Sequence, residues 1–518
     1  MRRVTSLTVV VVLLVLTAMS MACVAQEPVS GGSLVYVTDK APQRMDPYNT
    51  SWMSEVEGWV YDRLISVTAD GVFRDGLAES WEFNEDATTL TLKLKEGVTF
   101  HDGTPFDADA VVWNFEQTKR PTYVVGFEWG AVEKCVRLDQ YTVKYEFAQP
   151  YTHMLGVLAT RYASMVSPTA YELYGEDYGV GTNVVGTGPF VLTEYVAGEY
   201  AVLSRNDDYS WGASWLTNEG VAYLDSVRLM FVSEAATAAL MLEAGEADIV
   251  YGISASDATH LATLADVEIK SFPNVTTYFA VYDTQVAPFD DIAFRMALSH
   301  AVNKDAIVQA VFSGEAYACD SFFPPGFPSY LPEVAASTAY DPELARGLLS
   351  AGGYETPIEI SILAIDDSVF RQIATIVQAG FEEIGIMADI RLADKATADS
   401  LAGENQYGIY LNYWNWVDPA AIMEIFLGSA AVPYPNVYGQ AIAELDRLFE
   451  VASKSPTEST RLAFYEHAQR MEAAYVTCNP LANPNAIFGV RTNVVGFTPN
   501  TPQFGYGGPD IMDTWMRP

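Results

Sequence analysis

Positive charge is scarce in this 518-residue chain, which has 29 Lys and Arg residues against 66 Asp and Glu residues and a formal net charge of −37 at pH 7. A surface of this sign repels polyanions, so binding to nucleic acid is excluded. Hydrophobic residues nevertheless make up 50% of the sequence, which is typical of a folded chain rather than a disordered acidic one. At about 150 residues per domain the length predicts roughly three domains.

Long apolar runs are absent after the N-terminal residues. The one run long enough to matter to a membrane extends from about Leu7 to Ala22 and follows Arg2 and Arg3. Basic residues, an apolar stretch and a polar continuation form the pattern of a secretory signal, so we expect residues 1–22 to be removed on export. Nothing later approaches the roughly 20 uncharged apolar residues of a spanning helix, so we expect a soluble protein in the periplasm or at the cell surface.

Cysteine is also rare, with four residues in the chain. Cys23 directly follows Ser20-Met21-Ala22, which resembles a bacterial lipobox, where the cysteine is acylated and becomes the new N-terminus. We therefore predict a lipid anchor at Cys23. Ordinary signal cleavage after Ala22 or Ala25 is the alternative and would leave no lipid.

Motifs for catalysis and metal binding are missing. The five histidines form no HExxH pair and the cysteines no CxxC pair, so the sequence predicts no metal site. No GxSxG elbow or SxxK nucleophile is present, and the glycine-rich stretch 179–188 lacks the lysine of a phosphate-binding loop. We therefore expect a protein without a cofactor and without enzymatic activity. An extracytoplasmic hydrolase is the alternative class.

Helix and strand patterns alternate along the whole chain. Residues 89–95 read Thr-Leu-Thr-Leu-Lys-Leu-Lys, a period-2 alternation that predicts a half-buried antiparallel strand. Asp107-Ala108-Asp109 predicts a helix start, because acidic residues suit the positive end of a helix dipole. Further helices are expected at 233–243, 292–302, 342–350, 368–383 and 441–452. This mixture indicates an α/β or α+β chain.

Several sequence motifs stand in a fixed order along the chain. The densest block runs from Leu77-Ala78-Glu79-Ser80-Trp81 to His101-Asp102-Gly103-Thr104-Pro105-Phe106. The others include Tyr61-Asp62-Arg63-Leu64, Gly186-Thr187-Gly188-Pro189-Phe190, Arg205-Asn206-Asp207-Asp208-Tyr209 and Pro288-Phe289-Asp290-Asp291. In this order they resemble the extracytoplasmic solute-binding proteins of the peptide, nickel and oligosaccharide importer family, and the resemblance covers nearly the whole mature chain.

The resemblance implies the α/β, two-lobed periplasmic-binding-protein fold of type II, with two strands acting as a hinge. Lobe one would comprise residues 31–76, 190–283 and 491–518, with an extra subdomain at 77–189, and lobe two would comprise residues 284–489. The resemblance also implies a function. A monomer would capture a solute between its lobes and deliver it to the transmembrane permease of an ABC importer.

The candidate binding loop is Tyr410-Leu411-Asn412-Tyr413-Trp414-Asn415-Trp416-Val417-Asp418-Pro419, which resembles the family's loop on lobe two that faces the cleft. Tyr413, Trp414 and Trp416 offer flat apolar faces for a sugar ring, an aromatic side chain or a cation. We predict that at least one of the two tryptophans lies in the cleft. The alternative is that they belong to the core, because Trp alternating with Asn415 is also the pattern of a half-buried strand.

Ligand class depends on the charge at this loop. Peptide-binding members carry an Asp a few residues before the Asp-Pro, where it pairs with the ligand's ammonium group, and this chain has the neutral Asn415 near that place. The neutral amide puts ordinary peptide recognition in doubt, although Asp418 is a possible substitute. We therefore predict an oligosaccharide or a peptide-like solute. Tyr48 and Trp52 of lobe one are expected to face the same cleft, with a surface turn as the alternative.

The resemblance also brings two cysteines into one lobe. Cys319 falls near the start of lobe two and Cys478 near its end, so the two could form a disulfide that closes a long loop. Buried unpaired thiols are the alternative.

Overall fold

The computed structural model describes residues 27–517 except 51–53, 69–70, 124–128, 275, 320, 324, 328–329, 335–337, 405, 416–422, 425, 433–435, 437–440 and 499–510. The predicted signal and Cys23 lie outside the described residues, so the lipid anchor stays a prediction. Within the described part, none of the helices combines the length and the apolar character needed to span a bilayer.

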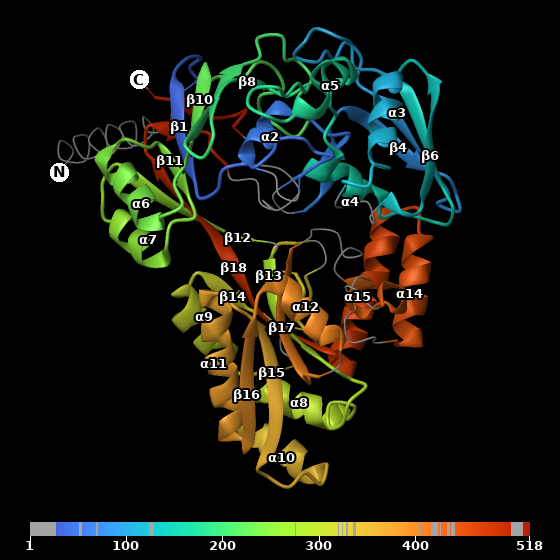
Figure 1. Cartoon of the computed structure of the whole chain (residues 1–518), viewed down its shortest axis with the longest axis vertical. Coiled ribbons are helices and arrows are strands. Elements are labelled where there is room, and N and C mark those ends of the chain that lie inside the picture. Colours follow the sequence, from blue (N-terminus) through green and yellow to red (C-terminus); the bar gives the residue numbers. More distant parts are fainter. Residues whose placement is uncertain are drawn as a thin grey trace, which may run out of the picture.

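Lobe one, at the top of Figure 1, is built on one end of a large mixed sheet. There β1 pairs in parallel with both β10 and β11, and β9 and β8 continue the sheet antiparallel. The strands are β1 (Ser33–Thr38), β8 (Phe190–Val196), β9 (Tyr200–Arg205), β10 (Ser226–Phe231) and β11 (Ile249–Tyr251). The helices are α2 (Glu55–Val60), α6 (Ala235–Ala244) and α7 (Ala255–Leu261).

A separate four-stranded antiparallel sheet, in the order β4-β5-β7-β6, forms a subdomain beside lobe one. Its strands are β4 (Ala78–Phe83), β5 (Thr89–Leu94), β6 (Val132–Asp139) and β7 (Thr142–Phe147). The hairpin before it joins β2 (Ile65–Val67) to β3 (Phe73–Asp75). The helical segments are α3 (Ala108–Gln117), α4 (Met154–Ala159), η2 (Arg161–Ala163), α5 (Pro168–Tyr174) and η3 (Gly175–Asp177).

Lobe two, at the bottom of Figure 1, contains the other end of the large sheet, where β15 pairs in parallel with β16 and β17. Its strands are β13 (Thr276–Tyr282), β14 (Ala316–Ala318), β15 (Ile358–Ile365), β16 (Ile386–Ala393) and β17 (Ile409–Asn415). Its helices are α8 (Ile292–Ala301), α9 (Lys304–Phe312), α10 (Pro342–Ala351), α11 (Ser368–Glu383), α12 (Lys395–Gly403), η4 (Ser429–Ala431), α14 (Ala443–Ser453) and α15 (Glu458–Tyr475). A last short pair, β19 (Val494–Val495) and β20 (Trp515–Met516), returns to lobe one.

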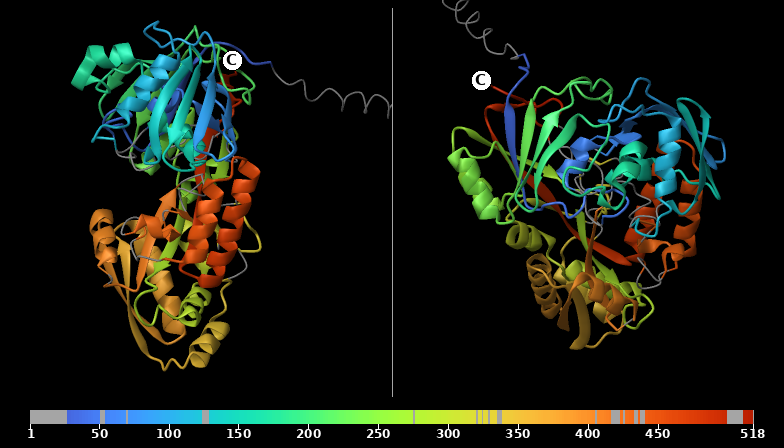
Figure 2. Two further views of the ribbon diagram at one scale, coloured as in Figure 1. Left: turned by 90° about the vertical axis from the view of Figure 1, so that its right-hand side faces the viewer. Right: turned by 45° about the horizontal axis from the view of Figure 1, so that its top comes forward.

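One strand, β18 (Cys478–Arg491), runs through both lobes. Its first half pairs with β13 and β14 of lobe two, and its second half pairs with β12 (Val267–Pro273) and with β11 of lobe one. β12 and β18 are therefore the two strands that cross between the lobes (Figures 1 and 2). The chain joins the lower sheet with β13, before residue 284 where the sequence analysis set the start of lobe two.

The predicted elements follow the expected local rules. β5 buries Leu90, Leu92 and Leu94 on one face, as the period-2 alternation requires. The Asp107 carboxylate accepts hydrogen bonds from the backbone N–H groups of residues 109 and 110 and thereby caps α3. The helix predicted at 368–383 is confirmed as α11, and α6, α8, α10 and α14 begin and end close to the expected residues.

The family-like motifs connect the subdomain to lobe one. The Asp62 carboxylate accepts hydrogen bonds from Thr187 Oγ1 at 3.0 Å and from the Trp211 indole N–H at 3.2 Å. His101 Nε2 lies 2.9 Å from the Gly188 carbonyl oxygen, and burial lowers the pKa of this histidine to about 4. These motifs therefore hold the subdomain and lobe one together.

Candidate functional site

The directions of the strands determine which of their ends face the other lobe. β18 enters lobe one from lobe two, and β11 is antiparallel to it, so the carboxyl end of β11 at Tyr251 points toward lobe two. β1 is parallel to β11, so Thr38 ends on the same side. In lobe two, Asn415 at the carboxyl end of β17 pairs with Thr276, which follows directly on the crossing strand β12. Carboxyl ends of parallel strands are the usual place for ligands in α/β proteins, and here they face one another across the two lobes.

Lobe one places charged groups at this edge. Glu55 is 5% exposed and Arg161 is 2% exposed, and one Arg161 Nη1–H donates to the Ser54 carbonyl oxygen at 2.8 Å. Burial raises the pKa of Glu55, while Arg161 and a hydrogen bond from Thr38 act in the opposite direction. The Arg161 guanidinium therefore acts on the buried Glu55 carboxyl group near the end of β1.

A second carboxylate lies behind this pair. Ser54 and Glu57 form a capping box at the start of α2, in which the Glu57 carboxylate accepts from the Ser54 backbone N–H at 2.8 Å. Burial raises the pKa of Glu57 to about 7, against the lowering effect of Ser54 and of Arg161. The positive charge of Arg161 therefore acts to lower the pKa of both buried carboxyl groups.

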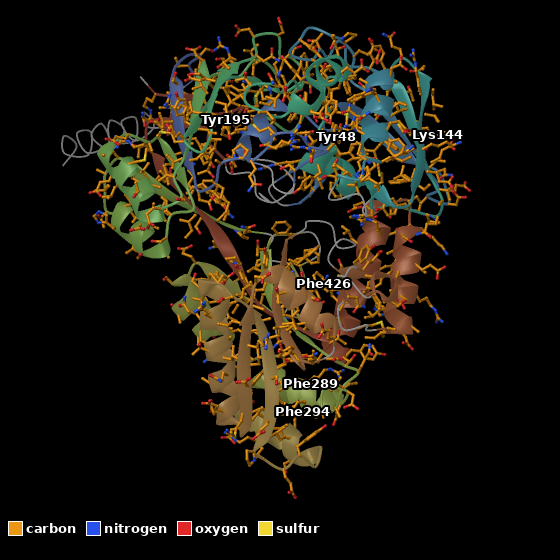
Figure 3. All side chains as sticks on the ribbon, viewed as in Figure 1. Tyr48, Lys144, Tyr195, Phe289, Phe294 and Phe426 are labelled. Atoms are coloured by element: carbon orange, nitrogen blue, oxygen red, sulfur yellow. The ribbon has the colours of Figure 1, made fainter. Side chains whose placement is uncertain are left out.

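Lobe two places rings and an amide at the facing edge. Tyr413 and Trp414 are both half-buried but point to opposite faces of β17, since side chains alternate along a strand. Tyr413 packs against Tyr278 and Phe370 with ring centroids 6.0 and 6.1 Å away. Trp414 packs edge-to-face against Phe426 at 5.0 Å, and Figure 3 shows Phe426 in the half of lobe two that lies toward lobe one. The pattern of a half-buried strand, named as the alternative, therefore describes both residues.

The other predicted site residues divide into two groups. Trp52, Trp416 and Asp418, together with the side chain of Asn415, lie outside the described residues and stay predictions. Tyr48 is described, and its expected exposure to the cleft is wrong. It is 1% exposed, its hydroxyl donates to the Asn114 side-chain oxygen, and its ring packs among other tyrosines in the interior of lobe one (Figure 3).

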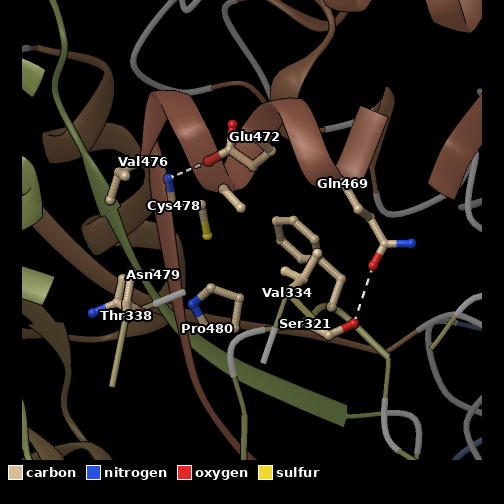
Figure 4. A pocket seen from close by; sticks show the side chains of 11 residues that line it. Ser321, Val334, Thr338, Gln469, Glu472, Val476, Cys478, Asn479 and Pro480 are labelled. Atoms are coloured by element: carbon tan, nitrogen blue, oxygen red, sulfur yellow. Dashed lines mark hydrogen bonds between the residues drawn. The ribbon is translucent and has the colours of Figure 1, made fainter. Parts of the chain in front are cut away.

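The predicted disulfide is not formed. Cys319 and Cys478 are buried free thiols, and Cys319 pairs with Leu481 in the β14–β18 ladder, three residues from Cys478. Three residues of strand span about 10 Å, whereas a disulfide requires Cα atoms within about 7 Å. Burial raises the pKa of the Cys319 thiol to about 12. Cys478 lines a water-sized cavity of about 20 Å³, where the Glu472 carboxylate accepts from its backbone N–H at 2.7 Å (Figure 4).

Glu55 and Arg161 are site residues that the sequence analysis missed. The Ser54-to-Glu57 spacing indicates a helix start but gives no reason to expect a ligand. Arg161 does carry a signal, because it follows the apolar stretch Met154-Leu155-Gly156-Val157-Leu158-Ala159, where a buried cation needs a partner. Among the described residues, no group of three or more His, Cys, Asp or Glu side chains is arranged to hold a metal ion.

Comparison with known proteins identifies the class. Residues 73–433 match the model of the bacterial extracellular solute-binding proteins, family 5, which is more than half of the chain. The chain belongs to this family. It is 27% identical over 472 residues to the glutathione-binding protein GsiB of Salmonella paratyphi A, covering 88% of this chain and 89% of that relative.

Solved structures agree on the fold. HbpA2 from Haemophilus parasuis has a TM-score of 0.82 at 22% identity, over 94% of this chain and 100% of that one. The periplasmic binding protein DppA from Helicobacter pylori, solved with the peptide STSA, has a TM-score of 0.74 at 23% identity, over 94% and 99% of the two chains. These matches confirm the predicted two-lobed α/β fold. Proteins of this family are exported and bind small solutes for ABC permeases, and this chain is the substrate-binding component of such an importer.

Proposed function

We propose that the captured solute is built from amino acids, as a short peptide or a related conjugate, and that the lobes close on it. The observation that supports this class is the presence of a buried carboxyl group, Glu55, and a buried guanidinium, Arg161, at the edge that faces lobe two. A zwitterionic solute needs groups of both signs, whereas a neutral sugar needs neither. The relatives add support, since one is named for glutathione and another was solved with a peptide.

An oligosaccharide is the second candidate. It is favoured by the neutral Asn415 and by the partly exposed rings of Tyr413 and Trp414, because sugars stack on aromatic faces and pair with neutral amides. The binding protein is proposed to act as a monomer that is anchored to the membrane through an acylated Cys23.

Small-angle scattering separates the two candidates. The purified protein, stripped of solute, is mixed with an equimolar set of dipeptides or with maltotriose, and we expect the dipeptides to produce compaction. In parallel, Asn415→Asp should strengthen binding of the dipeptides and weaken binding of maltotriose, because the added carboxylate attracts an ammonium group and is costly to bury beside a neutral sugar.

Compaction by maltotriose alone would favour the oligosaccharide. Chemical turnover of either probe by the protein alone would favour a hydrolase over a binding protein.

A further inference from the structure

Two buried polar atoms at the carboxyl end of β1 lack a hydrogen-bond partner among the described residues. They are the hydroxyl oxygen of Tyr36 and one carboxylate oxygen, Oε2, of Glu55. Tyr36 is 0% exposed, so water does not satisfy its hydroxyl from the surface. Folded proteins pair nearly all of their buried polar atoms, so these exceptions, to which Oε1 of Glu57 adds a third close by, indicate a missing partner.

The two atoms belong to one cluster. Glu55 is the strongest charged neighbour of the Tyr36 hydroxyl, and Arg161 and Asp39 act on both residues. Tyr251, at the carboxyl end of β11, faces the same carboxylate and is itself only half-buried. The cluster therefore lies one side chain away from the surface at the edge of lobe one that faces lobe two.

The charge of the cluster is incomplete. Arg161 acts on both Glu55 and Glu57, and one of its N–H groups is used by the Ser54 carbonyl oxygen. Two buried carboxyl groups with one guanidinium leave room for a further positive charge. Each carboxyl group has one buried oxygen without a partner among the described residues, Oε2 of Glu55 and Oε1 of Glu57, and Glu55 is the one that neighbours the Tyr36 hydroxyl.

We propose that an ammonium group of the solute binds between Glu55 and Tyr36, on lobe one. This assignment rests on the proposed function, because it requires that a solute enters between the lobes. A primary ammonium has three N–H donors, two of which would be accepted by Glu55 Oε2 and the Tyr36 hydroxyl oxygen. The carboxylate that peptide recognition requires would then lie on the lobe opposite Asn415, and the solutes selected would be those with a free amino group.

The test compares free and blocked amines on the whole protein. Dissociation constants are measured by native mass spectrometry for a mixture of dipeptides and for the same mixture after N-acetylation. We expect the parent protein to bind the free peptides at least about tenfold more tightly, as a charge-assisted buried contact implies. Glu55→Gln should remove this preference, and Tyr36→Phe should reduce it a few-fold while keeping the ring.

Glu450→Gln is the matched control, because Glu450 is an exposed carboxylate on α14 of lobe two, away from the cluster, and its loss makes the same change in net charge. It should alter the preference less than about twofold. If Glu55→Gln does not fold, the comparison of free and acetylated peptides on the parent protein and on Tyr36→Phe still decides the question.

Equal binding of free and acetylated peptides by the parent protein would overturn the ammonium site and leave peptide capture intact. An unchanged preference in folded Glu55→Gln would do the same, and the orphan atoms would then hold a buried water. Failure to bind either peptide mixture, with maltotriose bound instead, would overturn both this assignment and the proposed solute class.

Discussion

The two edges that face each other across the lobes are built from different chemistry. Lobe one holds Glu55, Glu57 and Arg161 in a buried ionic cluster, while lobe two presents the rings of Tyr413 and Trp414 on a strand end. Buried charges are useful only when their environment is fixed in advance, because an unpaired one is expensive. Aromatic rings, in contrast, can pack against many kinds of ligand surface. The difference indicates that lobe one determines which charged group is accepted and lobe two supplies the apolar contact area.

The largest effect is expected from Arg161→Ala in lobe one. The substitution leaves Glu55 and Glu57 buried without their common cation, which should lower the free energy of unfolding by about 3 to 5 kcal/mol in urea titrations. Arg205→Ala is the control, because Arg205 pairs with Asp207 and Asp225 at the surface and should cost at most about 1 kcal/mol. Equal losses for the two variants would mean that the ionic cluster of lobe one has no special role.

The second prediction concerns the pH dependence of stability, to which one buried glutamate in each lobe contributes. Burial raises the pKa of Glu57 in lobe one and of Glu472 in lobe two from 4.5 to about 7 in each case. A raised pKa means that the native state holds its proton more tightly, so the stabilisation present below pH 4.5 is lost as the pH rises through 7. Each group should account for a loss of about 3 kcal/mol in the free energy of unfolding over this range.

Glu57→Gln and Glu472→Gln should each flatten the pH profile, measured by urea unfolding between pH 4 and pH 8 at about half-unit steps. Glu450→Gln serves as the control, since Glu450 is exposed and pairs with Lys454 one helical turn further along α14. A flattened profile in only one of the two variants would place the titration in a single lobe.

The smallest expected effect concerns the apolar edge of lobe two. If Trp414 contacts the solute in the closed protein, Trp414→Ala should weaken binding more than about tenfold, as the loss of an aromatic anchor commonly costs at least about 2 kcal/mol. Trp414→Phe should retain part of the affinity. Dissociation constants for the dipeptide mixture provide the measurement, with thermal unfolding to establish that each variant is folded. Unchanged affinity in folded Trp414→Ala would assign the residue to packing against Phe426 alone.

Local structure could be predicted from the sequence where the signal is itself local. The limits of α11 follow from the Asp367 cap and from a regular apolar face, and β5 follows from strict alternation. The lobes and their order came from the family-like motifs. The boundary between the lobes near residue 284 was harder to predict from the sequence, because β13 joins lobe two through pairs with strands that come more than a hundred residues later.

The site was harder to predict because its contacts are long-range. Arg161 approaches Ser54 from 107 positions away in the sequence, so neither segment indicates the other. Tyr48 follows an Asp-Pro turn that suggests exposure, yet its hydroxyl finds Asn114 of α3 and the ring is enclosed. Residue type and spacing therefore pointed to the aromatic loop of lobe two, whose contact with the solute stays a prediction, whereas the charged edge of lobe one became visible only in three dimensions.

The position of β18 in the chain affects when the protein is able to fold. This strand lies at the centre of the large sheet but is formed by residues 478–491, so it is made after all four strands that it pairs with. Until it arrives, β11 and β12 lack a central partner in lobe one, and β13 and β14 lack one in lobe two. Such late, long-range pairing keeps both sheets incomplete during synthesis. The two lobes are therefore completed by one and the same segment, whereas the four-stranded sheet of the subdomain is made of residues 78–147 and does not need it.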